Sequence, residues 1–550
     1  MHKLLKILLS CCHISLHEKR QANNRNLSKS FFSSNHLLFK SIKKKKQQLK
    51  GRNMRRLHLN FLSNKRTIRF LQILAYFEGN PESTLRELAE MSGFKDRTIL
   101  LDIKNMRDYF APSIEITAAH TGYHFKILDA KSYTALKNQL VMHEPLFIIM
   151  ESILLGNLRS YEEWGEEFYF SESTMKRQLI RVANTLKEYD LTFSYSPVDL
   201  VGEEVNIRKF LKDFYYEADD LAPFTLEPSI EMSELINHIK ANRYHPSVGT
   251  DILPTDFYYQ FYIMIQRSRH KKYLPVTVPS EMDWQNDAAY RFFLSLKPKI
   301  FARYGFDIPD KELLVLYLYS ICKRTIDFPS KEQIFCQKFN VWSEIKIEAQ
   351  NYLIEYDPLL ADPAYPASTL IESFLTSIKY LDQLAPIMNK NITEVNRYAQ
   401  NTYPERYEKT HLFLKTKARK IGIHSRYLAD IAASLVLTIE AVRDTYVSNP
   451  KRIAFLFEGS SYISRSMKAK AIRYLNGYHT LYFPTIEQMD QDFFIDREIE
   501  IFVTNHAEYI SYLTIDMDYV LFQSIPDMDD WNHLLRTINP QISQDFFVCH

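Results

Sequence analysis

Early in the chain a short helix, a glycine break and a second short helix follow one another, and this order restricts the possible fold more than any other feature. Ser83-Thr84 offers an N-cap for a helix over 85–92. Gly93-Phe94-Lys95 then forms a tight break, and Asp96 offers an N-cap for a further helix over 97–110. The pattern predicts a helix-turn-helix, whose second helix can enter a major groove with its first turn leading.

Flanking segments complete a winged form of this unit. Apolar residues at helical spacing predict an amphipathic helix over 66–78. Alternating residues at 114–116 and 123–125, joined through a glycine, predict a β-hairpin wing. His120 and His124 can touch phosphate or the minor groove from this wing, although an exposed histidine without a role is the commoner case. The alternative for the whole unit is a helical hairpin for protein contacts, but the order of cap, turn, helix and wing favours DNA.

The helix over 97–110 is predicted to be a recognition helix. Its apolar residues Ile99, Ile103 and Met106 recur on one face, which we expect to be buried. We therefore predict that the following residues face DNA: Arg97, Thr98, Lys104 and Asn105.

A second unit of the same pattern follows. A hydrophobic helix over 145–155 and a short amphipathic helix over 161–168 precede a turn with N-cap character at 170–173. A second recognition helix is predicted over 174–189. The segments 192–195 and from Leu200 then resemble another wing, with Gly202 marking its turn.

The polar face of this second recognition helix is rich in basic residues. A solvated face would look similar, but after a helix and a turn it favours contact with nucleic acid. The DNA contacts predicted here are Lys176, Arg177, Gln178 and Arg181.

Size and composition indicate several soluble domains. At 550 residues the chain is too long for one hydrophobic core. Only 12 glycines, with many Leu, Ile, Lys and Glu, favour helices, so we expect a mainly α, multidomain fold. The five cysteines are scattered, without metal-ligand spacing or a disulfide framework, which fits a reducing cytoplasm. No apolar run is long enough for a membrane span.

The charge is unevenly distributed along the chain. Residues 1–53 hold 13 Lys or Arg against one acid, Glu18, so residues 54–550 hold 56 basic against 65 acidic residues and a net charge of −9. Attraction to nucleic acid must therefore come from local patches. We expect residues 1–53 to be a disordered basic extension, either a solvated tail or a phosphate-binding arm. Its apolar stretch lacks a convincing signal-peptide cleavage site, and Met54 resembles a natural start.

Two stretches of the sequence resemble the Mga/AtxA family of regulators from Gram-positive bacteria. They are STLRELAEMSGFKDRTILLDIKNMRDYF and, closing the second unit, LVGEEVNIRKFLKDFYYE. The resemblance implies a DNA-binding transcriptional activator of virulence or surface-protein genes, tuned by carbohydrate status, that works as a homodimer or higher oligomer.

The resemblance also implies an order of domains. Tandem winged helix-turn-helix units precede two helical phosphotransferase-regulation domains and an α/β domain similar to enzyme IIB of sugar transporters. The expected domains are the extension 1–53, winged units 54–130 and 131–220, helical domains 221–332 and 333–448, and the α/β domain 449–550.

In domains of this kind a histidine accepts phosphate from the sugar phosphotransferase system. The helix over 257–269 has Tyr259-Gln260 where many relatives carry an Asp-His pair, and the helix over 311–322 also lacks histidine. The remaining candidates are His245 first and His424 second, each more often an ordinary histidine than a phosphorylation site. A phosphocarrier protein would then be a partner.

The C-terminal region alternates strand candidates at 452–457, 480–483, 499–504 and 519–523 with helices, which predicts an α/β sheet. The loop after the first strand reads Glu458-Gly459-Ser460-Ser461, without the phosphorylated cysteine of enzyme IIB, so we expect a degenerate domain used for self-association.

No Walker loop, zinc spacing, nucleophile elbow or dinucleotide fingerprint is present, so we expect no enzyme, no metal and no cofactor. The alternative function is an RNA-binding antiterminator of a sugar operon. Such proteins need a small RNA-binding β domain at the start, whereas this fold is predicted to start with helices and a wing.

Overall fold

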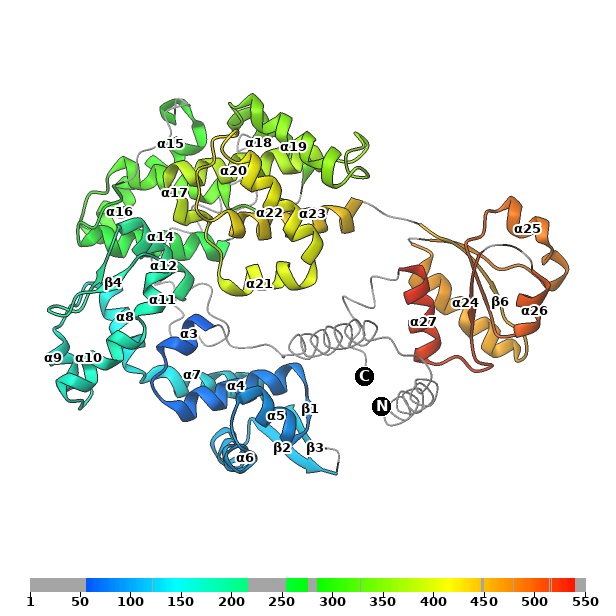
Figure 1. The fold of residues 1–550 in the computed structure, drawn as a ribbon, viewed down its shortest axis with the longest axis horizontal. Coiled ribbons are helices and arrows are strands. Elements are labelled where there is room, and N and C mark those ends of the chain that lie inside the picture. The colour runs from blue at the N-terminus through cyan, green and yellow to red at the C-terminus, as the bar shows by residue number, and fades with distance from the viewer. Residues whose placement is uncertain are drawn as a thin grey trace, which may run out of the picture. The chain divides into compact units, whose positions relative to one another are not determined.

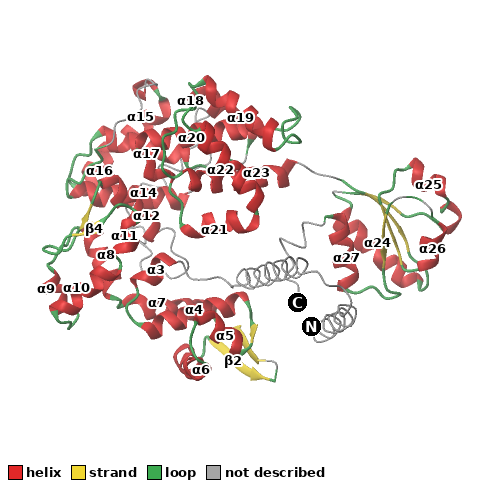
Figure 2. Cartoon of the chain, in the orientation of Figure 1, coloured by secondary structure: helices red, strands yellow, loops and turns green. Residues whose placement is uncertain are grey.

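The computed structural model describes residues 56–215, 254–275, 284–446 and 450–539, apart from 121, 327, 478, 514 and 516. The chain separates into two compact units, Met1–Ala441 and Val442–His550. Helices dominate the first unit, and the second holds a small sheet (Figures 1 and 2). The predicted mainly α, multidomain class is confirmed. Within the described part of the chain, no helix is both long and apolar enough to cross a membrane.

The first helix-turn-helix has the predicted order of elements. Thr84 caps α5 in a capping box, because its side chain accepts from the Glu87 N–H while the Glu87 carboxylate accepts from the Thr84 N–H. Gly93 ends this helix in a left-handed conformation with φ of 76°. The elements are α4 (Lys65–Gly79), β1 (Glu82–Ser83), α5 (Leu85–Ser92), α6 (Asp96–Phe110), β2 (Ile114–Ala119) and β3 (Gly122–Ile127).

One detail of this unit was predicted wrongly. Asp96 is the first residue of α6 and Lys95 is its N-cap, without a side-chain cap hydrogen bond. Asp96 still favours the helix start, because a carboxylate in the first turn interacts well with the helix dipole.

The wing is an antiparallel sheet in the order β1-β3-β2, in which His124 pairs with both Glu82 and Thr117. Gly122 begins β3 where the backbone of β1 approaches closely, and a Cβ at this position would lie 2.6 Å from the Ser83 carbonyl oxygen. Only glycine fits this contact, which holds the wing against the helices.

The second unit contains the predicted helices, with two differences. The recognition helix is broken at Val182, which adopts φ −93° and ψ 2° and donates to Leu179 in a three-residue step. Gly202 follows the second strand and does not lie in the hairpin turn, which spans 194–199. The elements are α7 (Ala130–Met142), α8 (Pro145–Leu155), α9 (Tyr161–Glu167), α10 (Glu172–Arg181), α11 (Ala183–Lys187), β4 (Thr192–Phe193) and β5 (Leu200–Val201).

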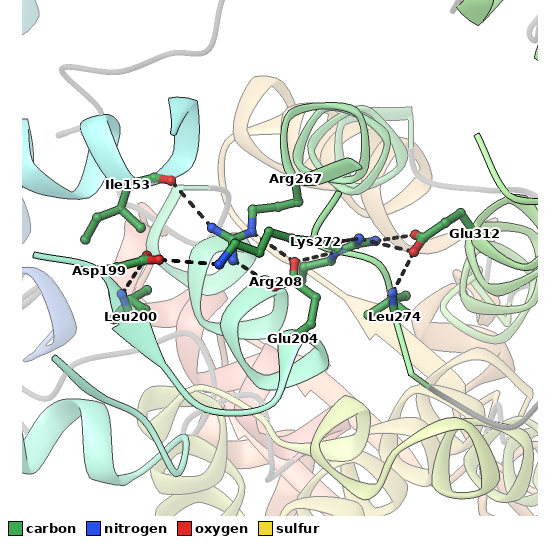
Figure 3. Close-up of polar contacts among 9 residues, drawn as sticks. All are labelled: Ile153, Asp199, Leu200, Glu204, Arg208, Arg267, Lys272, Leu274 and Glu312. Carbon is green, nitrogen blue, oxygen red and sulfur yellow. Dashed lines mark hydrogen bonds and ion pairs between the residues drawn. The ribbon is translucent and has the colours of Figure 1, made fainter. Parts of the chain in front are cut away.

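Buried charges fix α12 (Glu204–Tyr215), which follows this wing, to α14 (Pro254–Arg269) and α17 (Asp310–Cys322) (Figure 3). Glu204 accepts from Arg267 Nε and Nη2 at 2.9 and 2.7 Å, and from Arg208 Nε at 3.0 Å. Arg208 Nη1 reaches Glu312 Oε2 at 2.6 Å. The second unit and the helical region thus share one polar network and one apolar core.

The predicted helices at 257–269 and 311–322 are α14 and α17, and every side chain from Glu312 to Cys322 is buried. A buried helix that is apolar all round is what this composition predicts. The other helical elements here are α15 (Ala288–Leu294), α16 (Lys297–Tyr304), α18 (Pro329–Phe339), α19 (Ser343–Tyr356), α20 (Ala367–Leu384), η2 (Pro386–Asn389), α21 (Thr393–Thr402), α22 (Pro404–Lys417) and α23 (Leu428–Tyr446).

The second compact unit holds a parallel four-stranded sheet in the order β7-β6-β8-β9. Alternate residues along β6 bury opposite faces, since Ile453 and Phe455 pack with α24 and α27 while Ala454 packs with α25. The elements are β6 (Arg452–Leu456), α24 (Ser461–Leu475), β7 (Thr480–Tyr482), α25 (Gln491–Asp496), β8 (Ile501–Thr504), α26 (Ala507–Tyr512), β9 (Asp518–Leu521) and α27 (Met528–Ile538).

Candidate nucleic-acid interface

A buried ion pair sets the orientation of α6. Asp102 on α6 accepts from Arg69 Nε at 2.6 Å and from Arg69 Nη2 at 3.0 Å, and its side chain is only 2% exposed. The Arg69 guanidinium also lies 5.0 Å from the centre of the Phe94 ring in the turn before α6. This two-pronged pair directs one face of α6 toward α4 and leaves the opposite face in solvent.

The solvent face of α6 carries the predicted DNA contacts. Arg97 and Lys104, seven residues apart, are exposed on it, whereas Thr98 and Asn105 are half-buried at its edge. Within the part of the chain that the structure describes, neither Arg97 nor Lys104 has an ion-pair partner. Both cations are therefore available to an anionic ligand.

Two leucines between these cations were missed by the sequence interpretation. Leu100 is 45% exposed and Leu101 is 59% exposed. The signal was present, because Ile99, Ile103 and Met106 already account for the buried stripe and leave both leucines off it. In a major groove such side chains suit the methyl groups of thymine.

The wing brings further polar groups beside α6. The His124 ring nitrogen Nδ1 lies 3.4 Å from a Glu82 carboxylate oxygen on β1, so this histidine already has a partner. His120 at the wing tip and Lys126 are exposed. The guanidinium of Arg107 lies 5.9 Å from the Tyr123 ring and so connects α6 to the wing.

In the second unit, α10 presents a comparable face. Ser171 caps the helix by accepting from the Thr174 N–H at 3.3 Å. Arg177 is exposed and has no ion-pair partner among the described residues. Lys176 is exposed too, but its ammonium lies 5.9 and 5.5 Å from the rings of Tyr161 and Tyr195. Lys176 thus spans from α9 to the second wing.

The two other predicted residues of α10 differ in their contacts, and Arg181 is exposed although its guanidinium forms hydrogen bonds within the protein. Gln178 is half-buried, and its side-chain oxygen has no hydrogen-bond partner in the described structure. Arg181 donates from Nη2 to the Phe61 carbonyl at 3.3 Å and from Nη1 to the Leu62 carbonyl, and burial lowers the pKa of its guanidinium. These bonds satisfy the end of α3 (Arg56–Phe61), so Arg181 positions that helix within the protein.

The surroundings of α10 differ from those of α6 in charge. Its partner helix α9 carries Glu162, Glu163, Glu166 and Glu167. Tyr169, in the turn between the two helices, has φ of 56° and is 96% exposed. The sequence interpretation missed this aromatic ring, although a tyrosine in a predicted turn is a visible signal. The exposed cations Lys176 and Arg177 thus lie against a local acidic background.

Of the two histidines predicted as phosphorylation sites, only one lies among the described residues. His245 lies outside the described residues. His424 is exposed in the segment between α22 and α23, and its backbone N–H donates to Asp382 Oδ2 at 2.8 Å. Asp382 is buried on α20, and this burial raises the pKa of its carboxyl.

Residues 129–215 match the Mga helix-turn-helix domain. This match runs from the N-cap of α7 to the end of α12 and so covers the second unit. A protein of Streptococcus pneumoniae serotype 4, provisionally named a trans-acting regulator, is 24% identical over 182 residues. The aligned part is 32% of this chain and 37% of that protein, so the chain spans little more than a third of this curated relative.

Proposed function

We propose that this chain, a Mga-family regulator by its helix-turn-helix domain, binds duplex promoter DNA through α6 and α10 and thereby controls transcription. The observation that carries the proposal is the pair of solvent-facing helices in equivalent places of two helix-turn-helix units. Arg97 and Lys104 face solvent on the first, and Arg177 faces solvent on the second.

The electrostatics support local contacts at these helices. Because residues 54–550 carry a net charge of −9, the folded body repels DNA on average. Contacts with phosphate must then be short-range and depend steeply on salt. Thr98, Asn105, Lys176 and Gln178 complete the proposed contact set, whereas the bonds of Arg181 to backbone carbonyls assign it to the scaffold.

Gel shifts with duplex DNA and with hairpin RNA test the proposal against the antiterminator alternative. Arg97→Ala and Arg177→Ala should each weaken duplex binding by about 1–3 kcal/mol if the side chain reads a guanine. Loss of a phosphate contact would instead reduce the salt slope by about one. Arg419→Ala is a matched control, because Arg419 is exposed at the end of α22. Preference for the RNA hairpin, or full duplex affinity in both variants, would contradict the proposal.

The proposal includes control by phosphorylation at His424. A phosphoryl group adds about two negative charges. It would stand next to Asp382, whose carboxylate accepts from the His424 backbone, and would therefore loosen the segment before α23 from α20. Phosphopeptide mapping after incubation with the general phosphotransferase proteins should label wild-type protein and His411→Ala, but not His424→Ala. Absence of label from the wild-type peptide that contains His424 would remove this site, whatever label the peptide with His245 carries.

A further inference from the structure

A lysine-rich cavity of about 210 Å³ lies where α12 meets the helical region. Its walls come from α12, α14, the C-terminal end of α17 and the segment after η2. The charged groups that line it are Lys209, Lys212, Asp213, Asp256, Lys323 and Lys390.

Two of the lysines are neutralised by aspartates. Lys209 Nζ lies 2.6 and 2.7 Å from the two carboxylate oxygens of Asp213. Lys212 Nζ lies 2.9 Å from Asp256 Oδ1. The first pair lies within α12, and the second links α12 to α14. With four lysines against two aspartates, two positive charges of the cavity wall remain without a carboxylate.

The remaining two cations, Lys323 and Lys390, form no ion pair within the described part of the chain. Both are half-buried, and the Lys390 ammonium lies 5.0 Å from the Tyr189 ring. Burial, together with the charges of Lys209 and Lys212, lowers the pKa of Lys323 to about 8. Crowded cations without counter-ions are costly, so the arrangement favours binding of an anion.

We propose that this cavity binds a small anion bearing a phosphoryl group, held chiefly by Lys323 and Lys390. A phosphate dianion matches the excess charge of two. Lysine ammonium groups commonly bind phosphate by donating hydrogen bonds to its oxygens. The volume of about 210 Å³ is many times the roughly 10–15 Å³ that a cavity needs to hold one water, so there is room for phosphate or a small phosphate ester.

The location gives this site a consequence for the proposed DNA binding. The ligand would touch α12, which follows the second wing directly, and α17 and the η2 segment, which belong to the helical region. Binding therefore stabilises one arrangement of α12 against these helices, as an effector does. The binding itself is independent of whether the protein recognises DNA.

Calorimetric titration of the full chain, at constant ionic strength, tests the site with inorganic phosphate, glycerol 3-phosphate and glycerol. We expect saturable binding of both phosphates and none of glycerol. Equal affinities would identify free phosphate as the ligand, and tighter binding of glycerol 3-phosphate a small ester. Lys323→Gln and Lys390→Gln should each weaken binding about tenfold or more, since each removes a charged hydrogen bond. Lys346→Gln, an exposed lysine on α19, should bind as wild type does.

Proton uptake provides a second readout. The bound anion raises the pKa of Lys323, so binding near pH 8 should take up protons, and the heat should depend on the buffer's ionisation enthalpy. The charged and titratable groups around Lys323 are Lys209, Lys212 and Asp213 of α12, Asp256 of α14, Tyr319 of α17, and Lys390.

Folding of the variants is checked by melting without ligand, where Lys323→Gln should melt no lower than wild type because it removes an unfavourable charge. Absence of saturable phosphate binding to the wild type, or wild-type affinity in both folded variants, would overturn the proposal.

Discussion

Loss of the Glu312 carboxylate should open the junction between α12 and α17. Arg208 and Glu312 have side chains 8% and 2% exposed, and Glu312 also accepts from the Leu274 N–H at 2.7 Å. Glu312→Ala therefore leaves the buried Arg208 guanidinium without one of its carboxylate partners, and the buried Leu274 N–H without an acceptor. Breaking one side of a buried pair costs about 3–5 kcal/mol, and an unmet N–H costs about 1–3.

Part of this cost is offset, because Arg208 keeps Glu204 and the Lys272 carbonyl at 3.0 and 2.8 Å (Figure 3). We expect a net loss of about 4 kcal/mol for Glu312→Ala. Glu312→Gln keeps an acceptor for the Leu274 N–H and should lose about 2–3 kcal/mol. Hydrogen exchange of the α12 and α17 amides measures the local opening free energy directly, which suits a chain of several domains.

The double variant Arg208→Met with Glu312→Leu discriminates a charge effect from a packing effect. Removing both charges leaves the Glu204–Arg267 pair intact, so the double variant should lose only about 1–3 kcal/mol, the cost of the Leu274 N–H that still lacks an acceptor. Single Glu312 variants that exchange as slowly as wild type, or a double variant that loses the sum of both single losses, would show that the buried charge pair does not hold this junction.

Three further predictions concern other parts of the chain. Asp102→Asn should lower the free energy of unfolding by about 2–3 kcal/mol and weaken DNA binding, because α6 loses its ion pair with Arg69. Arg86→Gln, which removes an exposed pair with Glu90, should change the free energy of unfolding in urea by less than about 0.5 kcal/mol. Arg181→Ala should lower stability by about 2 kcal/mol, because the carbonyls of Phe61 and Leu62 lose their hydrogen-bond donor. Arg177→Ala should weaken DNA binding at unchanged stability. The reverse pattern in melting and gel-shift assays would contradict both assignments. The folded pKa of Lys323, about 8, lies below its ordinary 10.5, so the unfolded chain binds more protons between these values and wild-type stability should rise with pH there. The stability of Lys323→Gln should lack this rise with pH. Parallel pH profiles of stability in both proteins would show that Lys323 is not its source.

Local signals account for most of what could be predicted from the sequence. Thr84 followed by Glu87 determines a helix start by contacts within one turn, and Pro145 favours one through its fixed φ at the first helical position. The break at Val182 was missed because the apolar period continues through it, with Val182 and Leu186 both buried. Periodicity reports which face is buried and says little about a change of direction along the same face.

Long-range contacts explain what could not be predicted. Arg181 lies on the polar face of α10 by its spacing, and only the approach of α3, 120 residues earlier, engages it. Likewise, Arg208 and Glu312 are 104 residues apart, and nothing in either local sequence indicates their pairing. The exposed face of α6 was predictable because solvent exposure follows from the helical period alone.

The uninterrupted course of α12 has a mechanical consequence. Twelve helical residues form a stiff rod about 18 Å long. Gly202 and Glu203 alone separate this rod from the last strand of the second wing. If α12 tilts at its Lys212 end, its opposite end therefore moves as well. The strand attached there moves with it, because a linker of two residues is too short to take up the displacement.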